Sequence, residues 1–102
     1  MNRHRKAAEG EACVRCGNQD GTIVLCHYQG SMSHRLGKGM GIKPHDVAAG
    51  AWLCSNCHDL LDGRKPSYYT MDQRSLDMAL CCMQTVKIRY ERGDLHNDKR
   101  RD

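Results

Sequence analysis

The sequence CSNC at residues 54–57 repeats the Cys-x-x-Cys spacing of CVRC at residues 13–16, with residues 17–53 between the two pairs. Each pair turns the chain so that its two sulfur atoms point the same way. Four thiolates form the tetrahedral ligand set that structural zinc prefers. Ordinary buried cysteines would explain one such pair by chance but hardly two. We therefore predict one structural zinc ion, with the ligands Cys13, Cys16, Cys54 and Cys57.

The composition supports a fold that needs such a staple. The chain has 102 residues, 39% of them hydrophobic, with one Trp and no Phe, so a single domain of this size has only a small core. The N-terminal sequence MNRHRKAAEG lacks the apolar segment of a secretory signal, and no run reaches membrane-spanning length. We therefore expect a cytoplasmic protein without a membrane segment. In such a reducing compartment, repeated Cys-x-x-Cys spacing indicates a metal site rather than disulfides.

The positive charge is modest and unevenly distributed. The formal net charge is +4, and a zinc ion held by four thiolates would reduce it to about +2. Basic residues gather at both ends of the chain, where they are either solvated tails or nucleic-acid contacts. We expect a flexible basic arm at residues 1–10, a single domain at 11–95 and a basic tail at 96–102.

Two short strands and a long loop are expected between the cysteine pairs. Residues 22–28 are β-prone, and residues 47–53 form a second apolar segment. Residues 29–45 contain four glycines and three basic residues, which is typical of a long functional loop.

Two helices are expected after the second cysteine pair. Ser55 is placed to cap a helix over residues 56–62 that ends at Gly63. Thr70 with Gln73 has the spacing of a capping box and predicts a helix over about 71–92. Side chains recur at helical spacing along it, and its Met and Leu residues predict core packing: Leu76, Leu80, Met83, Val86 or Lys87, and Tyr90. Cys81 and Cys82 are expected to be core thiols.

Histidines and an aspartate near the second cysteine pair suggest metal-dependent chemistry. In a helix, His58 and Asp62 would lie one turn apart on the same face. An imidazole and a carboxylate so placed can share a divalent ion with open positions for water and a phosphate oxygen. His27 ends the first predicted strand, and an imidazole titrates near neutral pH, as a general base requires. A solvated or packed side chain is the alternative for any single histidine.

These elements resemble the HNH endonucleases, also called His-Me finger or ββα-metal nucleases, over residues 11–65. His27 matches the family's first histidine, the base, and His58 its last, a metal ligand. Residues 5–8 (RKAA), 43–46 (KPHD) and 54–59 (CSNCHD) are most similar to the small nucleases of lambdoid prophages, the YbcO-like group.

The resemblance implies an α+β fold: a small zinc-stapled ββα-metal finger with a C-terminal amphipathic helix. It implies an endodeoxyribonuclease that hydrolyses DNA with little dependence on sequence. His27 would be the general base, and a second divalent ion (Mg²⁺, Mn²⁺ or another transition metal) would be held by His58 and Asp62. Phosphate contacts would come from the basic residues Arg35, Lys38, Lys43, Arg64 and Lys65.

Two departures from the family pattern leave an alternative open. The family's middle Asn is missing before the second cysteine pair, where Asp46 is the nearest polar substitute. Cys26 stands where many members place a metal-binding Asp or His, and a thiol suits soft metals better than Mg²⁺. The alternative is a non-catalytic zinc module that binds nucleic acid or a phage or host protein.

Overall fold

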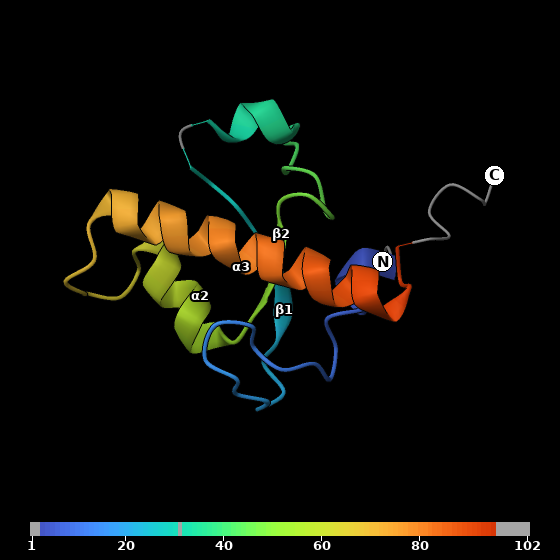
Figure 1. Cartoon of the computed structure of the whole chain (residues 1–102). Helices are drawn as coiled ribbons and strands as arrows, with labels where there is room; N and C mark the ends of the chain where they lie inside the picture. The colour runs from blue at the N-terminus through green and yellow to red at the C-terminus, as the bar shows by residue number, and fades with distance from the viewer. Residues whose placement is uncertain (1–2, 31, 96–102) are drawn as a thin grey trace.

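The computed structural model describes residues 3–30 and 32–95, so the predicted tail at 96–102 and the first two residues of the predicted arm lie outside the described residues. These described residues form six elements (Figure 1): α1 (Arg3–Lys6), β1 (Val24–His27), the 3₁₀ helix η1 (Ser33–Leu36), β2 (Gly50–Leu53), α2 (Ser55–Asp62) and α3 (Met71–Arg92). The long helix α3 crosses the two-stranded sheet, and η1 lies at the end of an excursion between the strands.

The two strands pair antiparallel, and both are shorter than predicted. Val24 lies opposite Leu53 at one end of the sheet and His27 opposite Gly50 at the other. The second predicted strand began at residue 47, but β2 begins only at Gly50. The ring Nδ1 of His45 accepts the backbone N–H groups of Val47 and Ala48 at 3.1 Å each, which holds them in a turn.

The outer edge of β2 is closed by groups that are not strands. The backbone N–H of Trp52 donates to Thr85 Oγ1 of α3 at 3.1 Å, and the Trp52 carbonyl accepts from the Val14 amide at 3.0 Å. Thr85 also donates its hydroxyl to the Cys81 carbonyl, 2.9 Å away within the same helix. Unpaired backbone groups on a buried edge would be costly, so Thr85 joins α3 to the sheet.

The predicted helices are present, with one change in capping. The capping box of Thr70 and Gln73 is confirmed, and both α2 and α3 end at glycines in the left-handed conformation, Gly63 and Gly93. The N-cap of α2 is Cys54 rather than the predicted Ser55, because the Cys54 sulfur accepts the Cys57 amide.

The apolar row on α3 faces outward, so the prediction that it packs in the core was wrong. Leu76, Leu80, Met83 and Tyr90 are 63%, 48%, 64% and 65% exposed. The face of α3 that packs inward carries mostly smaller or amphipathic side chains: Met78, Cys81, Cys82, Thr85 and Arg89. Small side chains let the helix approach the β2 backbone closely enough for the Thr85 hydrogen bond.

The described part of the N-terminal segment also differs from the predicted flexible arm. Residues Arg3–Lys6 form α1, and Ala8 is completely buried in the core. Arg3 Nη2 donates to the carbonyl of Asp94 beyond α3, at 2.8 Å. Ala8 and Arg3 therefore attach this segment to the domain, although most of its side chains are exposed.

The core is small and rich in cysteine. Trp52 is its one large aromatic side chain, and six of the seven cysteines are buried. Burial raises the pKa of the Cys26 and Cys81 thiols to about 12 and that of Cys82 to about 11, so these thiols are protonated at neutral pH. Among the described helices, none combines the length and hydrophobicity that crossing a membrane requires.

Replacing Thr85 by Val keeps the shape of the side chain but leaves the buried backbone N–H of Trp52 without its acceptor. We expect Thr85→Val to lower the free energy of unfolding by about 1–3 kcal/mol, measured by urea denaturation in excess zinc. Gln84→Ala, on an exposed position of the same turn, is the control and should change it by less than about 0.5 kcal/mol. Equal stability of both variants would show that Thr85 does not hold α3 to the sheet.

Candidate functional site

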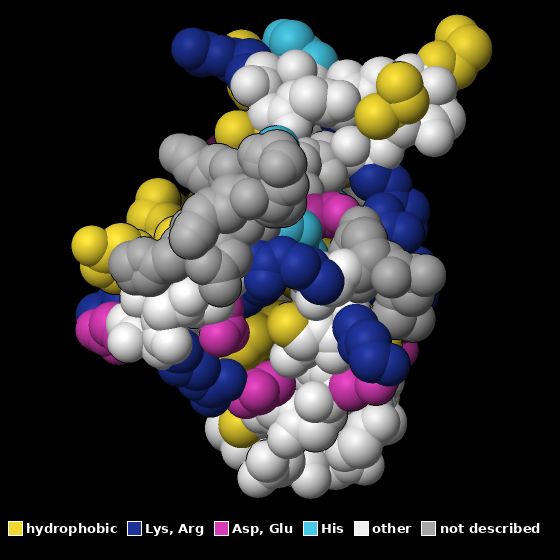
Figure 2. All heavy atoms as spheres, turned by 90° about the vertical axis from the view of Figure 1, so that its right-hand side faces the viewer, with side chains coloured by type: hydrophobic (Ala, Val, Ile, Leu, Met, Phe, Trp, Pro, Cys, Tyr) yellow, Lys and Arg dark blue, Asp and Glu magenta, His cyan; other side chains and the backbone are white. Residues whose placement is uncertain are grey.

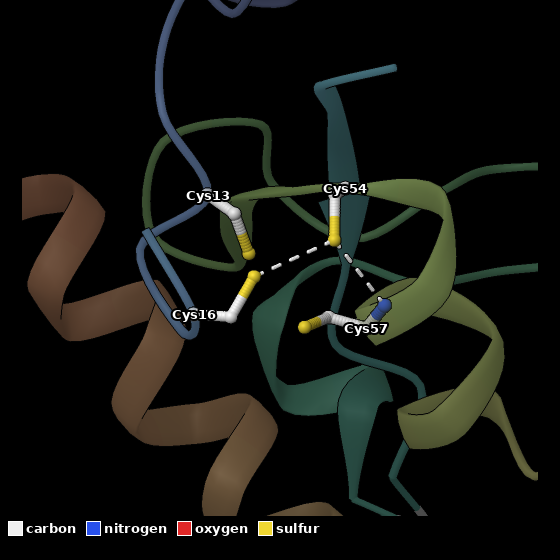
Figure 3. Close-up of side chains that lie close together, drawn as sticks. All are labelled: Cys13, Cys16, Cys54 and Cys57. Carbon is white, nitrogen blue, oxygen red and sulfur yellow. Dashed lines mark hydrogen bonds between the residues drawn. The ribbon is translucent and has the colours of Figure 1, made fainter. Parts of the chain in front are cut away.

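The two cysteine pairs converge at one point. The four sulfur atoms of Cys13, Cys16, Cys54 and Cys57 lie within 4.8 Å of one another (Figure 3), and the Cys16 and Cys54 sulfurs are 3.7 Å apart. Four sulfurs at 2.3 Å from a central zinc ion would be about 3.8 Å from each other. The observed separation fits this geometry, so these four residues could hold a zinc ion.

The backbone around the cluster favours the thiolate form of Cys13, whereas burial raises the pKa of the Cys57 thiol. Burial opposes ionisation of the Cys13 thiol, but hydrogen bonds from the backbone amides of Cys54, Cys16 and Arg15 outweigh it and lower its pKa to about 7. A metal ligand must be a thiolate. Cys13 is thus prepared for metal binding in a way that the inert core thiols are not.

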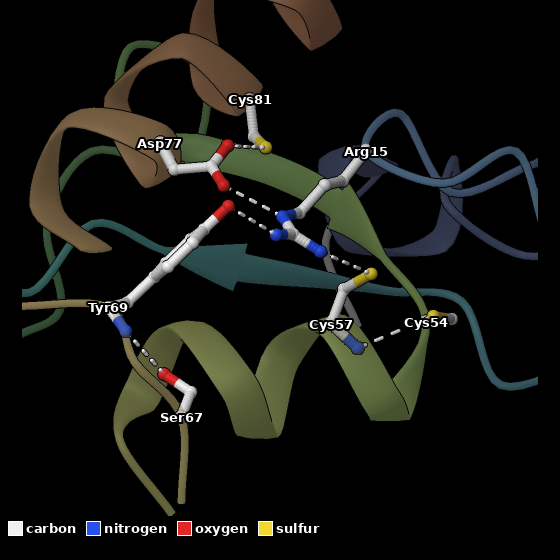
Figure 4. Close-up of polar contacts among 7 residues, drawn as sticks. All are labelled: Arg15, Cys54, Cys57, Ser67, Tyr69, Asp77 and Cys81. Carbon is white, nitrogen blue, oxygen red and sulfur yellow. Dashed lines mark hydrogen bonds and ion pairs between the residues drawn. The ribbon is translucent and has the colours of Figure 1, made fainter. Parts of the chain in front are cut away.

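Arg15 forms a second layer around the cluster, which the sequence analysis did not identify. Its Nη1 donates to the Cys57 sulfur at 3.5 Å, its Nε to Asp77 Oδ2 at 2.8 Å and its Nη2 to the Tyr69 hydroxyl at 3.1 Å (Figure 4). The hydrogen bond with Asp77 raises the pKa of the guanidinium further, so the positive charge is permanent. It would offset part of the negative charge of a four-thiolate site. The only sequence signal is its position inside the first Cys-x-x-Cys pair.

The predicted base, His27, is bound to an aspartate. Its Nε2 lies 2.6 Å from Asp46 Oδ1, and its side chain is only 4% exposed. Asp46 also faces the Arg5 guanidinium at 3.6 Å. The substitute proposed for the missing asparagine therefore lies against His27.

A glycine, Gly50, allows the segment that carries Asp46 to come close to His27. Gly50 is the sheet partner of His27, and a Cβ there would collide with the Asp46 carbonyl oxygen and the Leu25 side chain. The absence of a side chain at Gly50 lets the turn that carries Asp46 lie against the end of β1. That close approach, unseen in the sequence, positions the carboxylate.

The predicted metal pair is adjacent, as helical spacing requires. His58 Nε2 and Asp62 Oδ2 are 3.3 Å apart on α2, and both side chains are partly exposed. Two ligand atoms at about 2.1 Å from one ion would be about 3.0–3.4 Å apart in octahedral or tetrahedral geometry. The pair thus fits two positions of a divalent site. Within residues 3–30 and 32–95, however, only the four cysteines bring three or more candidate metal ligands together, so His58 and Asp62 are a pair without a third protein ligand.

One pocket connects the predicted base with the predicted metal ligand. A pocket of about 260 Å³ is lined by His27 and Asp62, and by the N-terminal part of α3, including Asp72, Arg74 and Ser75. His58 is not among its lining residues. Arg74 is a cation at this pocket that the sequence analysis did not single out, since nothing local distinguishes it from other helix-surface arginines.

The predicted phosphate contacts fall into two groups. Arg35, Lys38 and Lys43 are exposed on the excursion between the strands. Arg64 instead pairs with Asp62 at 3.2 Å and Asp59 at 3.4 Å, and Lys65 donates to Asn56. Figure 2 shows one face of the molecule, where basic side chains alternate with acidic ones. The cations on the excursion are thus exposed to solvent, whereas Arg64 and Lys65 beyond α2 are already bound to side chains of α2.

Cys26 does not join either cluster. It is 2% exposed within the core, and its thiol donates to the Val24 carbonyl at 3.7 Å. With a pKa raised by burial and by nearby Asp62, it has the features of a core thiol. The idea that it replaces a metal-binding residue gains no support.

If the four cysteines bind zinc, the ion contributes on the order of 10 kcal/mol to folding. Purified protein should contain about one zinc ion, and its complete chelation should abolish the cooperative unfolding transition. Cys16→Ser and Cys57→Ser should lose zinc and unfold, whereas Cys81→Ser, outside the cluster, should retain both metal and fold. A metal-free protein that still unfolds cooperatively would contradict the assignment.

The comparisons agree with a nuclease family. A family model described as "Putative nuclease YbcO" matches residues 2–94, nearly the whole chain. No curated protein and no solved structure matches the chain. Because this family model covers nearly the whole chain, the chain belongs to the YbcO nuclease family.

Proposed function

We propose that this protein is an HNH-type endonuclease that uses a divalent ion to hydrolyse DNA phosphodiester bonds. The observation that carries the proposal is the hydrogen bond between Asp46 and His27, because His27 lines the same pocket as Asp62. A hydrogen-bonded imidazole beside a candidate metal ligand is the arrangement that activates water for attack on phosphorus. The match to the nuclease family supports it.

Asp46 determines which nitrogen of His27 can act. A carboxylate only accepts hydrogen bonds, so the proton of the neutral ring resides on Nε2, which faces Asp46. Nδ1 then carries the lone pair that takes a proton from water. As the ring becomes positive, the Asp46 carboxylate stabilises it. Arg5 faces the same carboxylate at 3.6 Å and adds a positive charge on its other side.

His58 and Asp62 would hold the divalent ion, which would supply Lewis-acid stabilisation of the charge on the phosphate and the leaving oxygen. Arg74, which lines the same pocket and donates Nη1 to the Tyr69 carbonyl at 3.0 Å, would bind a phosphate oxygen there. Arg35, Lys38 and Lys43 would hold the DNA backbone on either side. Such contacts position the duplex without reading its sequence, so the enzyme would have little intrinsic specificity.

The competing function is a non-catalytic zinc module that binds nucleic acid or a phage or host protein. It is favoured by the burial of His27, whose side chain is 4% exposed and already hydrogen-bonded, as a purely structural histidine would be. The two functions differ in whether removal of the imidazole changes a reaction rate.

His27→Ala should reduce plasmid nicking in Mg²⁺ or Mn²⁺ by about 10²- to 10⁴-fold, the usual contribution of a general base. Asp46→Ala should also slow cleavage, because the ring then loses the acceptor that holds its proton on Nε2. Zinc content and DNA binding should be unchanged in both. His58→Ala and Asp62→Ala should lose activity that higher metal concentration partly restores, which is not expected for His27→Ala.

His34→Ala, at an exposed position of η1, is the matched histidine control and should cleave normally. Absence of cleavage by the wild-type protein with Mg²⁺, Mn²⁺, Ni²⁺ or Zn²⁺ on duplex, single-stranded and branched DNA would favour the zinc module instead.

Removal of the three cations on the excursion tests where DNA lies. If Arg35, Lys38 and Lys43 each contact one phosphate, the triple alanine variant should bind more weakly to all sequences. Its slope of log K against log salt should fall by about three units. Lys87→Ala, which removes a charge on α3 that is paired with Glu91, should leave the slope unchanged. An unchanged slope in the triple variant would place the DNA on another surface.

A further inference from the structure

The outward face of α3 carries a regular row of large side chains. Leu76, Leu80, Met83, Lys87 and Tyr90 are all exposed and follow one another at intervals of four, three, four and three residues. This interval is the heptad spacing of a helix that packs against another helix along a seam. The row extends over about 21 Å at 1.5 Å per residue. It lies opposite the face that Cys81, Cys82 and Thr85 press against the sheet.

A seam of this kind is unusual on a solvent-facing helix. The outer face of a surface helix is normally polar, yet four of the five side chains in the row are large hydrophobic residues about half exposed or more. Figure 1 shows α3 running across the front of the described structure with no other described element over it. A second helix is the partner that heptad spacing fits best.

We infer that a second copy of this chain covers the row, with the two α3 helices packed antiparallel. The twofold axis would pass between Leu80 and Met83. Leu80 would then face the partner's Met83, and Leu76 would face the partner's Lys87. The same surface on both copies forms the contact, as a closed twofold dimer requires.

The charge of Lys87 selects the antiparallel orientation. Parallel helices would bring Lys87 against its own copy inside the seam, where like charges repel. Antiparallel helices place its aliphatic stem along the partner's Leu76, with the partner's Asp72 one turn away. Lys87 Nζ also bonds to Glu91 at 2.7 Å within its own helix, so its charge is balanced from both sides.

Two hollows beside the row provide space for side chains of a partner. One, of about 220 Å³, is lined by Tyr69, Gln73, Leu76, Asp77 and Leu80. The other, of about 300 Å³ and mainly apolar, is bounded on α3 by Ala79, Cys82 and Met83. A row of projecting side chains with hollows at its flanks is self-complementary, because each copy offers both knobs and holes.

Sedimentation velocity of the zinc-loaded protein, at concentrations up to about 200 µM, tests the inference. The wild-type protein should form a dimer. Leu80→Glu should raise its dissociation constant at least about 100-fold, since both copies lose a buried leucine. Lys87→Leu should lower it by removing the one charge in the seam. Zinc content and helical circular dichroism verify that each variant is folded.

Met40→Glu is the matched control, since Met40 is fully exposed on the excursion and outside the row; it should dimerise normally. Orientation is tested by two changes at one position. Leu76→Glu can pair with the partner's Lys87 in the antiparallel dimer, so it should weaken association less than Leu76→Lys. Equal effects of these two changes would overturn the antiparallel order. A wild-type monomer throughout, or a Leu80→Glu variant that still dimerises normally, would overturn the proposed interface.

Discussion

Convergence of four cysteine sulfurs from residues 13–16 and 54–57 is the constraint on which the rest of the fold depends. The chain between them contains both strands and the excursion that carries η1. Once the two ends of this segment meet, β1 and β2 become neighbours, which removes much of the entropy cost of pairing two four-residue strands. A core with one Trp and few large aliphatic side chains would otherwise supply little to hold such a long closed segment.

The cluster also fixes the orientation of the elements around it. Cys54 is both a candidate ligand and the N-cap of α2, because its sulfur accepts the Cys57 amide. The direction of α2, and with it the position of His58 and Asp62, therefore follows from the cluster. On the other side, Arg15 connects the Cys57 sulfur to Asp77 of α3. The candidate reactive groups thus belong to elements that the cysteines hold in place, while Gly50 lets Asp46 reach His27.

The sequence was most informative where the signal is local. The Thr70–Gln73 capping box, the glycines that end both helices and the cysteine spacing each involve a few neighbouring residues, and each is confirmed by the structure. The ββα-metal topology and the catalytic roles of His27 and His58 stay predictions. The Arg15–Cys57 contact, 42 positions apart, and the His27–Asp46 contact, 19 apart, depend on the folded chain and have no sequence pattern of their own. The packing of Ala8 in the core was missed for a different reason. Its basic neighbours made residues 1–10 resemble a solvated arm.

The error about α3 has a more general physical cause. Hydrophobic periodicity locates an apolar face, but α3 has two, and the larger side chains suggested the wrong one. The inward face is chosen by fit to a backbone: Cys81, Cys82 and Thr85 are small enough to let the helix meet β2, where Thr85 accepts the Trp52 amide. Large residues such as Leu80 or Met83 would hold the helix away from that strand. They remain outside, on the side away from Met71, Arg74 and Met78 of the pocket. A partner helix on the outer face and a substrate in the pocket would therefore contact different sides of α3.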